Sequence, residues 1–319
     1  MWKVLRPEIF QGSNKRKNYF EGWYFKLIDK NMQHVIALIP GVSLGKEGRD
    51  HHAFIQLFDA ISGQTEYLRY PLNDFESSRS RFEVLISESF FAKDRISLNM
   101  ENPNICIQGD LHFKNIRSYP STLQEPGIMG PFSFVPFMEC YHGIVNIHHE
   151  IVGKLNINGK LIDFTDGYGY IEKDWGRSFP KAWVWMQSNH FEMEDISFMF
   201  SVAKIPWGPT SFTGFLCFLR IGETFHRFAT YTGAKIHSMK HQNKMLEIFI
   251  KDRRHLLKIR AINNDASKLL APTHGNMSRT IEESISASIY ISLWNKKGDK
   301  LFSGIGRQAG LEIIDFQEL

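Results

Sequence analysis

The segment from Gly167 to Phe191 places ionisable side chains among large aromatic ones. Glu172 and Asp174 have the same parity on an extended chain, so both side chains are expected on one face. Apolar walls disfavour a charged carboxylate, and aromatic faces attract cations. A carboxyl group in such surroundings can keep its proton near neutral pH and donate it to a hydrophobic substrate. This segment is therefore the first place to seek a general acid.

Two other carboxylates have comparable neighbours. Glu21 precedes Trp23 in an aromatic run near the N-terminus, and Glu139 lies shortly before His142. In order of preference, the candidate catalytic residues are Asp174, Glu172, Glu21 and Glu139, the last together with His142. Aromatic and amide side chains near these carboxylates are the candidate substrate-binding residues. They are Trp23, Phe25, Tyr170, Trp175, Trp183, Trp185, Gln187 and Asn189.

Structural roles stay open for the same residues. Glu172 and Asp174 could pair with nearby cations around a turn, the candidates being Lys173, Arg177 and Lys181. Glu21 could instead pair with Arg307. The tryptophans could be ordinary core, and the two amide side chains could satisfy buried backbone groups.

Composition narrows the function classes. The chain has 319 residues, enough for two domains, with 38 basic and 34 acidic side chains that are scattered along it. Nucleic acid is therefore not an expected partner. The basic cluster of residues 15–17 could touch the phosphate head groups of a membrane transiently, but three charges are more typical of a solvated loop.

The three cysteines, Cys106, Cys140 and Cys217, form no CxxC pair and are expected to be free thiols in a reducing compartment. Charged residues interrupt the N-terminus, where a signal peptide would need an apolar run, and also every longer apolar stretch. These features predict a cytoplasmic protein, with peripheral membrane contact as an addition.

Histidine clusters raise the question of a metal. His51 and His52 are neighbours, as are His148 and His149, so the members of each pair point to opposite faces of a strand. No metal site is expected from them. The GxSxG motif and the motifs for nucleotide and dinucleotide binding are absent, so nucleophilic hydrolysis and nucleotide chemistry are not expected.

A period of two dominates the chain, with short β-branched and aromatic runs separated by turn residues. Asn158-Gly159 and Lys297-Gly298 are two-residue hairpin signals between such runs. No long amphipathic helix competes with this pattern. The expected fold class is all-β, with antiparallel sandwiches or barrels.

An aromatic strand around Trp23 is echoed around Trp183, half the chain later, with one residue inserted. A duplicated barrel would give this spacing. We therefore predict two domains, residues 1–157 and 158–319. The stretch 118–136 is rich in proline, glycine and apolar residues, so it is expected to be a non-regular connection that covers a barrel mouth or a domain seam.

Several separated motifs resemble, in order, those of the tocopherol cyclase family. They are Phe20-Glu21-Gly22-Trp23-Tyr24-Phe25-Lys26, Gly130-Pro131-Phe132, Val135-Pro136-Phe137-Met138-Glu139-Cys140-Tyr141-His142-Gly143, Gly169-Tyr170-Ile171-Glu172-Lys173-Asp174-Trp175-Gly176, Ser178-Phe179-Pro180, Gln187-Ser188-Asn189, Phe228-Ala229-Thr230-Tyr231-Thr232-Gly233-Ala234 and Ala309-Gly310-Leu311-Glu312. The resemblance implies two lipocalin-like antiparallel β-barrels packed together, a fold shared with carotenoid hydratase-like proteins.

The same resemblance implies an isomerase or lyase that cyclises a prenylated hydroquinone to a chromanol without a cofactor. A general acid would protonate a trisubstituted alkene, and the ring hydroxyl would capture the tertiary cation. Hydration of an isoprenoid double bond and non-catalytic carriage of a hydrophobic prenyl lipid remain the alternatives. In each case the partner is a hydrophobic small molecule.

Overall fold

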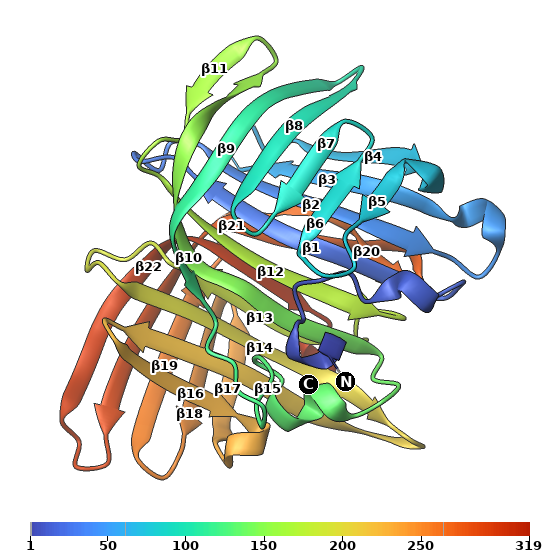
Figure 1. The fold of residues 1–319 in the computed structure, drawn as a ribbon. Helices are drawn as coiled ribbons and strands as arrows, with labels where there is room; N and C mark the ends of the chain where they lie inside the picture. Colours follow the sequence, from blue (N-terminus) through green and yellow to red (C-terminus); the bar gives the residue numbers. More distant parts are fainter. Residues whose placement is uncertain (1, 61, 264) are drawn as a thin grey trace. The chain divides into compact units, whose positions relative to one another are not determined.

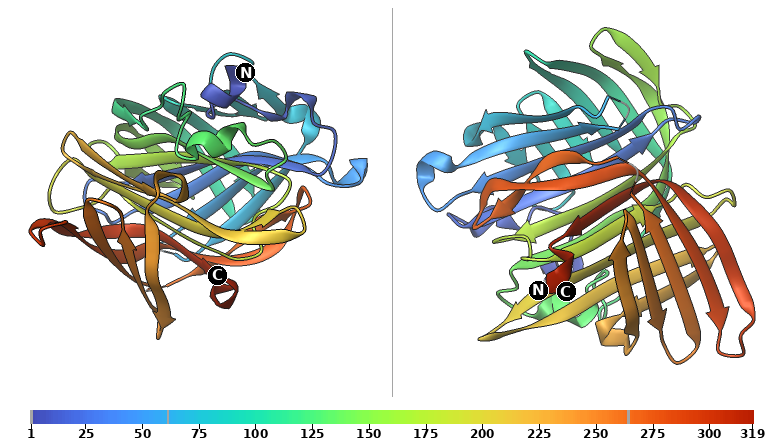
Figure 2. Two further views of the ribbon diagram at one scale, coloured as in Figure 1. Left: turned by 90° about the horizontal axis from the view of Figure 1, so that it is seen from below. Right: turned by 180° about the vertical axis from the view of Figure 1, so that it is seen from behind.

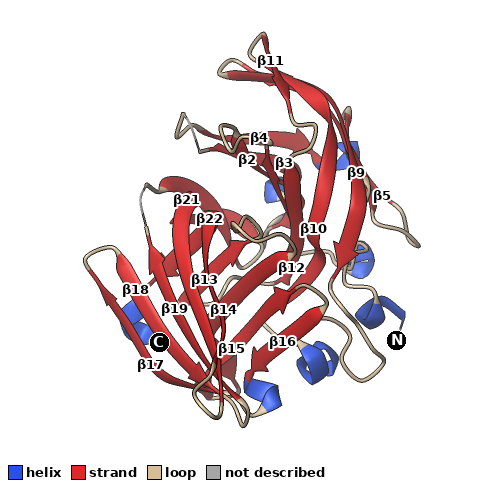
Figure 3. Ribbon diagram, turned by 90° about the vertical axis from the view of Figure 1, so that its left-hand side faces the viewer, coloured by secondary structure: helices blue, strands red, loops and turns tan. Residues whose placement is uncertain are grey.

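The structure is a computed structural model that describes residues 2–60, 62–263 and 265–319. Its strands form two antiparallel sheets (Figure 1). The described residues contain only short 3₁₀ helices besides the strands (Figure 3). They are η1 (Trp2–Leu5), η2 (Gly12–Asn14), η3 (Gly48–Asp50), η4 (Leu72–Asp74), η5 (Gly130–Phe134), η6 (Thr230–Thr232) and η7 (Phe316–Glu318). The predicted all-β class is confirmed.

The first sheet uses the N-terminal half of the chain. Its strands are β1 (Tyr19–Ile28), β2 (Val35–Leu44), β3 (His52–Asp59), β4 (Thr65–Pro71), β5 (Phe75–Ser77), β6 (Glu83–Ile86), β7 (Ser89–Ala92), β8 (Arg95–Asn102), β9 (Ile105–Ser118), β10 (Cys140–Ile157), β11 (Lys160–Asp163) and β12 (Tyr168–Gly176). The predicted hairpin at Asn158-Gly159 joins β10 to β11, with positive φ at both residues as a type I′ turn requires.

The second sheet follows in the same manner. Its strands are β13 (Trp183–Ser188), β14 (Ile196–Trp207), β15 (Thr210–Ile221), β16 (Thr224–Ala229), β17 (Lys235–Gln242), β18 (Met245–Lys251), β19 (His255–Ile262), β20 (Ser267–Thr273), β21 (Asn276–Asn295) and β22 (Lys300–Ile314). The predicted Lys297-Gly298 hairpin joins β21 to β22, and Gly298 has a φ of 93°.

Each sheet pairs its first long strand with its last. β12 lies between β1 and β10 in the first sheet, and β22 lies between β13 and β21 in the second. The repeated topology agrees with the duplication that the sequence predicted. Alternation along the strands gives each sheet its own buried apolar cluster, with Phe25 and Ile171 in the first and Val184 and Met186 in the second.

The chain divides into two compact units, residues 1–179 with 268–281, and residues 180–267 with 282–319. The sequence predicted domains of residues 1–157 and 158–319, whereas the division between these units falls after residue 179. β11 and β12 belong to the first unit because β11 pairs with β10 and β12 pairs with both β1 and β10. The repeat in the sequence indicated a division near the middle of the chain, but it did not show that β12 pairs with β1 in the first sheet.

Residues 268–281 form the tip of the long β20–β21 hairpin and pack on the first unit, beside the strands drawn in blue (Figure 2). The backbone of Leu270 exchanges two hydrogen bonds with the side chain of Gln56, at 2.8 and 3.2 Å. Ser43 donates its hydroxyl to the carbonyl of Gly275 at 2.7 Å. Fully buried Ser43 thus helps to hold a segment distant in sequence, which local patterning could not reveal.

The surroundings of Gly275 show how closely the tip of this hairpin packs. Its φ is 85°, and a Cβ there would lie 2.3 Å from the carbonyl oxygen of Leu44 and 2.4 Å from the amide nitrogen of Tyr19. Gly298 has a similar φ of 93° but no neighbouring atom within 4 Å. We expect Gly298→Ala to cost about 1 kcal/mol of unfolding free energy from backbone strain. Gly275→Ala is expected to cost about 2 kcal/mol more, because backbone must move.

Urea unfolding of both variants measures this difference. Equal losses of stability would show that the tip is not packed as tightly as the structure indicates.

Candidate active site

The candidate site is built on two neighbouring strands, β10 and β12. Their antiparallel register pairs His142 with Asp174 and Ile144 with Glu172. Side chains alternate along β12, so Tyr170, Glu172 and Asp174 share one face while the intervening residues point to the other. This pairing brings His142 beside the two carboxylates that the sequence placed on a common face.

The imidazole of His142 lies between the two carboxylates. Its Nδ1 is 2.9 Å from Oδ1 of Asp174, and its Nε2 is 3.6 Å from Oε2 of Glu172. Tyr170 donates its hydroxyl to Oε2 of Glu172 at 2.6 Å. The Glu172 and His142 side chains are only 5 % and 13 % exposed, whereas that of Asp174 is 24 % exposed. The result is a largely buried acid–base cluster.

Electrostatics favour the imidazolium form of His142. Burial lowers the pKa of this imidazole, but the charges of Asp174 and Glu172 and the hydrogen bond to Asp174 outweigh that effect. The pKa of His142 is therefore raised to about 9. Burial, together with the charge of Glu172, raises the pKa of the Tyr170 hydroxyl. At neutral pH the cluster combines a cation, two carboxyl groups and a neutral phenol.

The connection between β9 and β10 adjoins this cluster at both ends. Buried Tyr119, at its start, is close enough to Tyr170 to affect the titration of that phenol. Cys140, at its end, contacts Oδ1 of Asp174 through its sulfur at 3.8 Å. Between them, Sδ of Met129 accepts a hydrogen bond from the backbone of His142 at 3.1 Å. The apolar stretch that the sequence predicted as a cover thus packs next to the candidate site.

The opposite face of β12 carries a different arrangement. Lys173 points into the apolar cluster of the first sheet and forms a fully buried ion pair with Glu21, with 2.5 Å between Nζ and Oε1. The Nζ atom also lies 4.7 Å from the ring centre of Trp23 and 4.9 Å from that of Trp175. Burial lowers the pKa of Lys173, and the charge of Glu21 opposes this effect.

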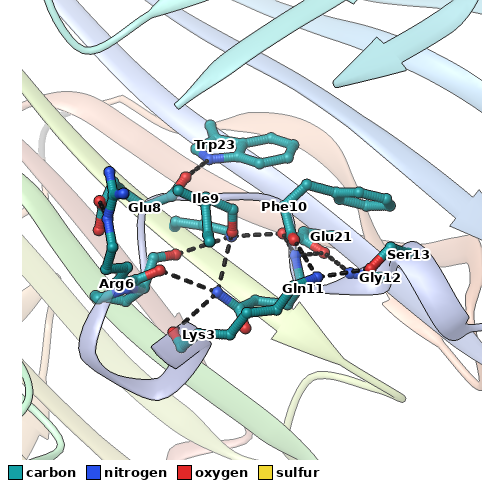
Figure 4. Close-up of polar contacts among 12 residues, drawn as sticks. Lys3, Arg6, Glu8, Ile9, Phe10, Gln11, Gly12, Ser13, Glu21 and Trp23 are labelled. Carbon is teal, nitrogen blue, oxygen red and sulfur yellow. Dashed lines mark hydrogen bonds and ion pairs between the residues drawn. The ribbon is translucent and has the colours of Figure 1, made fainter. Parts of the chain in front are cut away.

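The N-terminal segment supplies the remaining hydrogen bonds of this ion pair. Lys173 donates to the carbonyls of Pro7 and Ile9 at 2.8 and 2.5 Å. Glu21 accepts from the backbone amides of Gln11 and Gly12, as Figure 4 shows. A buried charge is tolerated when partners satisfy its remaining hydrogen-bonding capacity, and here backbone groups of residues 7–12 supply them.

Several predicted site residues therefore lie on this interior face. Glu21 pairs with Lys173 and not with Arg307, which lies 3.4 Å from Glu192 instead. The indole of Trp23 stacks on Phe82, with 5.5 Å between ring centres, and its Nε1 donates to the carbonyl of Glu8 at 2.9 Å. Phe25 is fully buried in the same cluster, and Trp175 stacks on Tyr141.

The other predicted residues have separate neighbours. Glu139 lies 4.0 Å from Arg177, and burial raises the pKa of this carboxyl group, with Arg177 opposing the effect. Trp183 and Trp185 alternate with core residues of the second sheet, so they lie on its other face, followed by buried Gln187 and Asn189. The roles of these residues stay predictions.

Sequence reasoning missed three contributors to these arrangements. Lys173 is one of the cations that the sequence offers as partners for Glu172 and Asp174, yet the alternation that unites the two carboxylates places Lys173 on the opposite face. Cys140 and Tyr119 gave no signal, because their proximity depends on strand pairing and on the path of the β9–β10 connection.

His142, Glu172 and Asp174 each present one donor atom, and these atoms lie within 4.8 Å of one another. They form the group in the described residues that is best arranged to hold a cation. The pairs that the sequence considered have other contacts: His52 lies 2.7 Å from the Tyr67 hydroxyl, and His149 packs on Phe113.

Fold and site together define a class of protein: an antiparallel, lipocalin-like β-protein with a buried acid–base cluster on its first sheet. The profile of the tocopherol cyclase-like family matches residues 107–314, more than half of the chain. The chain therefore belongs to the tocopherol cyclase-like family, as the sequence motifs predicted.

Curated relatives agree with this assignment. The chain is 23 % identical over 203 residues to "Probable tocopherol cyclase, chloroplastic" of Oryza sativa subsp. japonica, covering 60 % of this chain and 43 % of the relative. It is 24 % identical over 197 residues to "Tocopherol cyclase, chloroplastic" of Zea mays, covering 56 % and 40 %. The matched region thus spans less than half the length of each relative.

Solved structures show the same fold at low identity. The crystal structure of CghA with Sch210972 has a TM-score of 0.56 and 9 % identity, covering 93 % of this chain and 88 % of CghA. A Nitrosomonas europaea protein assigned as AttH has a TM-score of 0.50 and 14 % identity, covering 92 % of each chain. None of the helices in the described ranges has the length and apolar character that crossing a bilayer requires.

The buried ion pair predicts a large effect of removing one partner. Lys173→Met would leave the Glu21 carboxylate buried without a cation, and we expect a loss of about 3–5 kcal/mol in unfolding free energy. The matched control is Lys154→Met, which removes a half-exposed pair with Asp163 of 2.9 Å and should leave the unfolding free energy nearly unchanged, because solvent screens the pair.

Adding Glu21→Gln to Lys173→Met should restore part of the lost stability, because the uncompensated charge is gone. Urea unfolding measures all three proteins. Similar losses for Lys173→Met and Lys154→Met would contradict the structural role of the buried pair.

The raised pKa of His142 predicts a dependence of stability on pH. The imidazole titrates near 6.5 when unfolded and at about 9 when folded, so folding favours the protonated form. The stabilisation is complete below pH 6.5 and is lost as the pH rises through about 9. It amounts to roughly 3 kcal/mol at most.

Denaturant midpoints measured across this range should fall more steeply for the parent protein than for His142→Gln. Parallel profiles would exclude an imidazolium at this position.

Proposed function

We propose that this protein protonates a carbon–carbon double bond of a prenylated aromatic or other isoprenoid lipid, with Asp174 as donor and Glu172 as second candidate. The observation that carries the proposal is the contact of both carboxyl groups with the imidazole of His142, which a pKa of about 9 makes a cation. Membership of the tocopherol cyclase-like family supports the substrate class.

The reaction needs one proton and returns it. A carboxylic acid donates its proton to the less substituted alkene carbon, and the π electrons form the new C–H bond. The tertiary cation left behind is captured by the ring hydroxyl, which forms the C–O bond of a chromanol. The hydroxyl proton then passes to the carboxylate, so the product has the mass of the substrate.

His142 supplies the proton in this scheme. Its imidazolium Nδ1 lies 2.9 Å from Oδ1 of Asp174, so the proton can pass to that carboxylate, which delivers it to the alkene while the imidazole becomes neutral. Tyr170 holds Glu172 by a hydrogen bond of 2.6 Å, which fixes the second carboxyl group near the same cation. Aromatic faces near the substrate would stabilise the carbocation.

Hydration would share the first step, with water replacing the ring hydroxyl as the nucleophile. Carriage of the lipid without reaction is the outcome if the cluster is structural. The three cysteines are free, as predicted. The cytoplasmic location inferred from them stays a prediction, and the two plant relatives are described as chloroplastic.

Asp174→Asn tests the donor. It preserves the size of the side chain but removes its ability to be an acid, so we expect turnover of a prenylated hydroquinone to fall about 10²–10⁴-fold. The matched control is Asp163→Asn, which changes a half-exposed carboxylate on β11, a strand that pairs with β10, and should retain full activity.

Mass spectrometry of the product identifies the reaction. An unchanged mass at a new retention time indicates cyclisation, and the mass of one added water indicates hydration. Full turnover by Asp174→Asn together with loss in Glu172→Gln would transfer the donor role to Glu172. Activity should survive a chelator, since the proposed step requires no metal.

A further inference from the structure

The connection between β9 and β10 leaves large apolar side chains unburied. Leu123 is 77 % exposed, Phe134 48 % and Phe137 98 %. Other exposed large apolar residues of the described ranges are scattered singly over separate turns and strands. A concentration of such residues in one short segment marks an interaction surface.

The same segment is firmly held at its base. Ile128 and Met129 are buried, and Tyr141 donates its hydroxyl to the carbonyl of Val135 at 2.8 Å. The Tyr141 oxygen also accepts the backbone amide of Met138 at 3.3 Å. The exposed side chains therefore project from an ordered support.

Phe137 has an unusual backbone. Its φ of 64° lies in the left-handed region, which is unfavourable for a bulky side chain. The hydrogen bonds of Tyr141 to both sides of Phe137 stabilise this conformation. The fold thus accepts local strain at the residue whose ring is most exposed, a combination that is common at functional positions.

Charge is sparse in this segment. Between Arg117 and Glu139 the only charged residue is Glu125. Arg177 lies close to the end of the segment, because its backbone amide donates to the carbonyl of Glu139 at 2.8 Å, and its side chain is 57 % exposed. An apolar segment that ends at a half-exposed cation suits the interface of a bilayer, where rings enter the acyl boundary and cations meet phosphates.

We propose that residues 119–139 insert Leu123, Phe134 and Phe137 into the interface of a phospholipid bilayer. Few inserted side chains are enough for reversible binding to a membrane, whereas a stable protein interface buries about 800 Å² per partner. The surface differs from the basic cluster of residues 15–17 that the sequence indicated. Because Met129 contacts His142 and Tyr119 adjoins Tyr170, binding would bring the acid–base cluster close to lipid-dissolved molecules.

The test is sedimentation of the full chain with vesicles of phosphatidylcholine, alone and mixed with phosphatidylglycerol. The variant is the double substitution Leu123→Ser and Phe137→Ser. The matched control is Leu161→Ser with Trp207→Ser, which removes two similarly exposed apolar side chains from β11 and β14. We expect the first variant to bind both vesicles at least about tenfold more weakly, and the control to bind like the parent protein.

Three results would overturn the inference: no vesicle binding by the parent protein, equal weakening in the control, or no weakening in the Leu123/Phe137 variant. Concentration-dependent self-association that only this variant loses, without vesicle binding, would identify a protein interface instead. Turnover of substrate presented in detergent micelles tests the proposed chemistry separately, because it needs no bilayer. The Leu123/Phe137 variant should keep that activity, so the two proposals fail independently.

Discussion

The buried ion pair between Glu21 and Lys173 is the interaction on which the first unit depends. Neither charge could remain alone in an apolar cluster, because removing an ion from water costs several kcal/mol unless an oppositely charged partner offsets it. The pair joins β1 to β12, and it requires the backbone of residues 7–12 as additional hydrogen-bonding partners. One polar contact thus ties the first strand, the last strand and the N-terminal segment together.

This constraint also determines what the other side of β12 presents. With Lys173 held in the interior, strand alternation directs Glu172 and Asp174 to the opposite face. β10 pairs with β12 along one edge and places His142 opposite Asp174, so the two side chains project to the same face of the sheet. The interior pair is structural in this arrangement, and the carboxylates available for chemistry are those beside the imidazole. The connection from β9 to β10 then packs against them and carries apolar side chains to the surface.

The two sheets repeat the same strand topology, but the repeated tryptophans lie on different faces of them. β1 and β13 are the first strands of their sheets, and each pairs with the last strand of its sheet, β12 and β22 respectively. The predicted duplication therefore appears in the topology. The faces differ, however. Trp23 lies in the core of its sheet, whereas Trp183 lies on the face opposite to the core of its own. The inserted residue of the second copy lies between Phe179 and Trp183, before β13 begins, so the sequence repeat does not determine which face of that strand meets the core.

The sequence alone determined the features that depend on near neighbours. These are the all-β class, the hairpin at Asn158-Gly159, the shared face of Glu172 and Asp174, and the motifs that define the family. Only the tertiary structure decided that Lys173 belongs to Glu21, that His142 joins the two carboxylates, and that residues 268–281 complete the first unit. Each of these follows from pairing between strands far apart in the chain, where many registers satisfy the same local alternation and only packing of the whole sheet selects one.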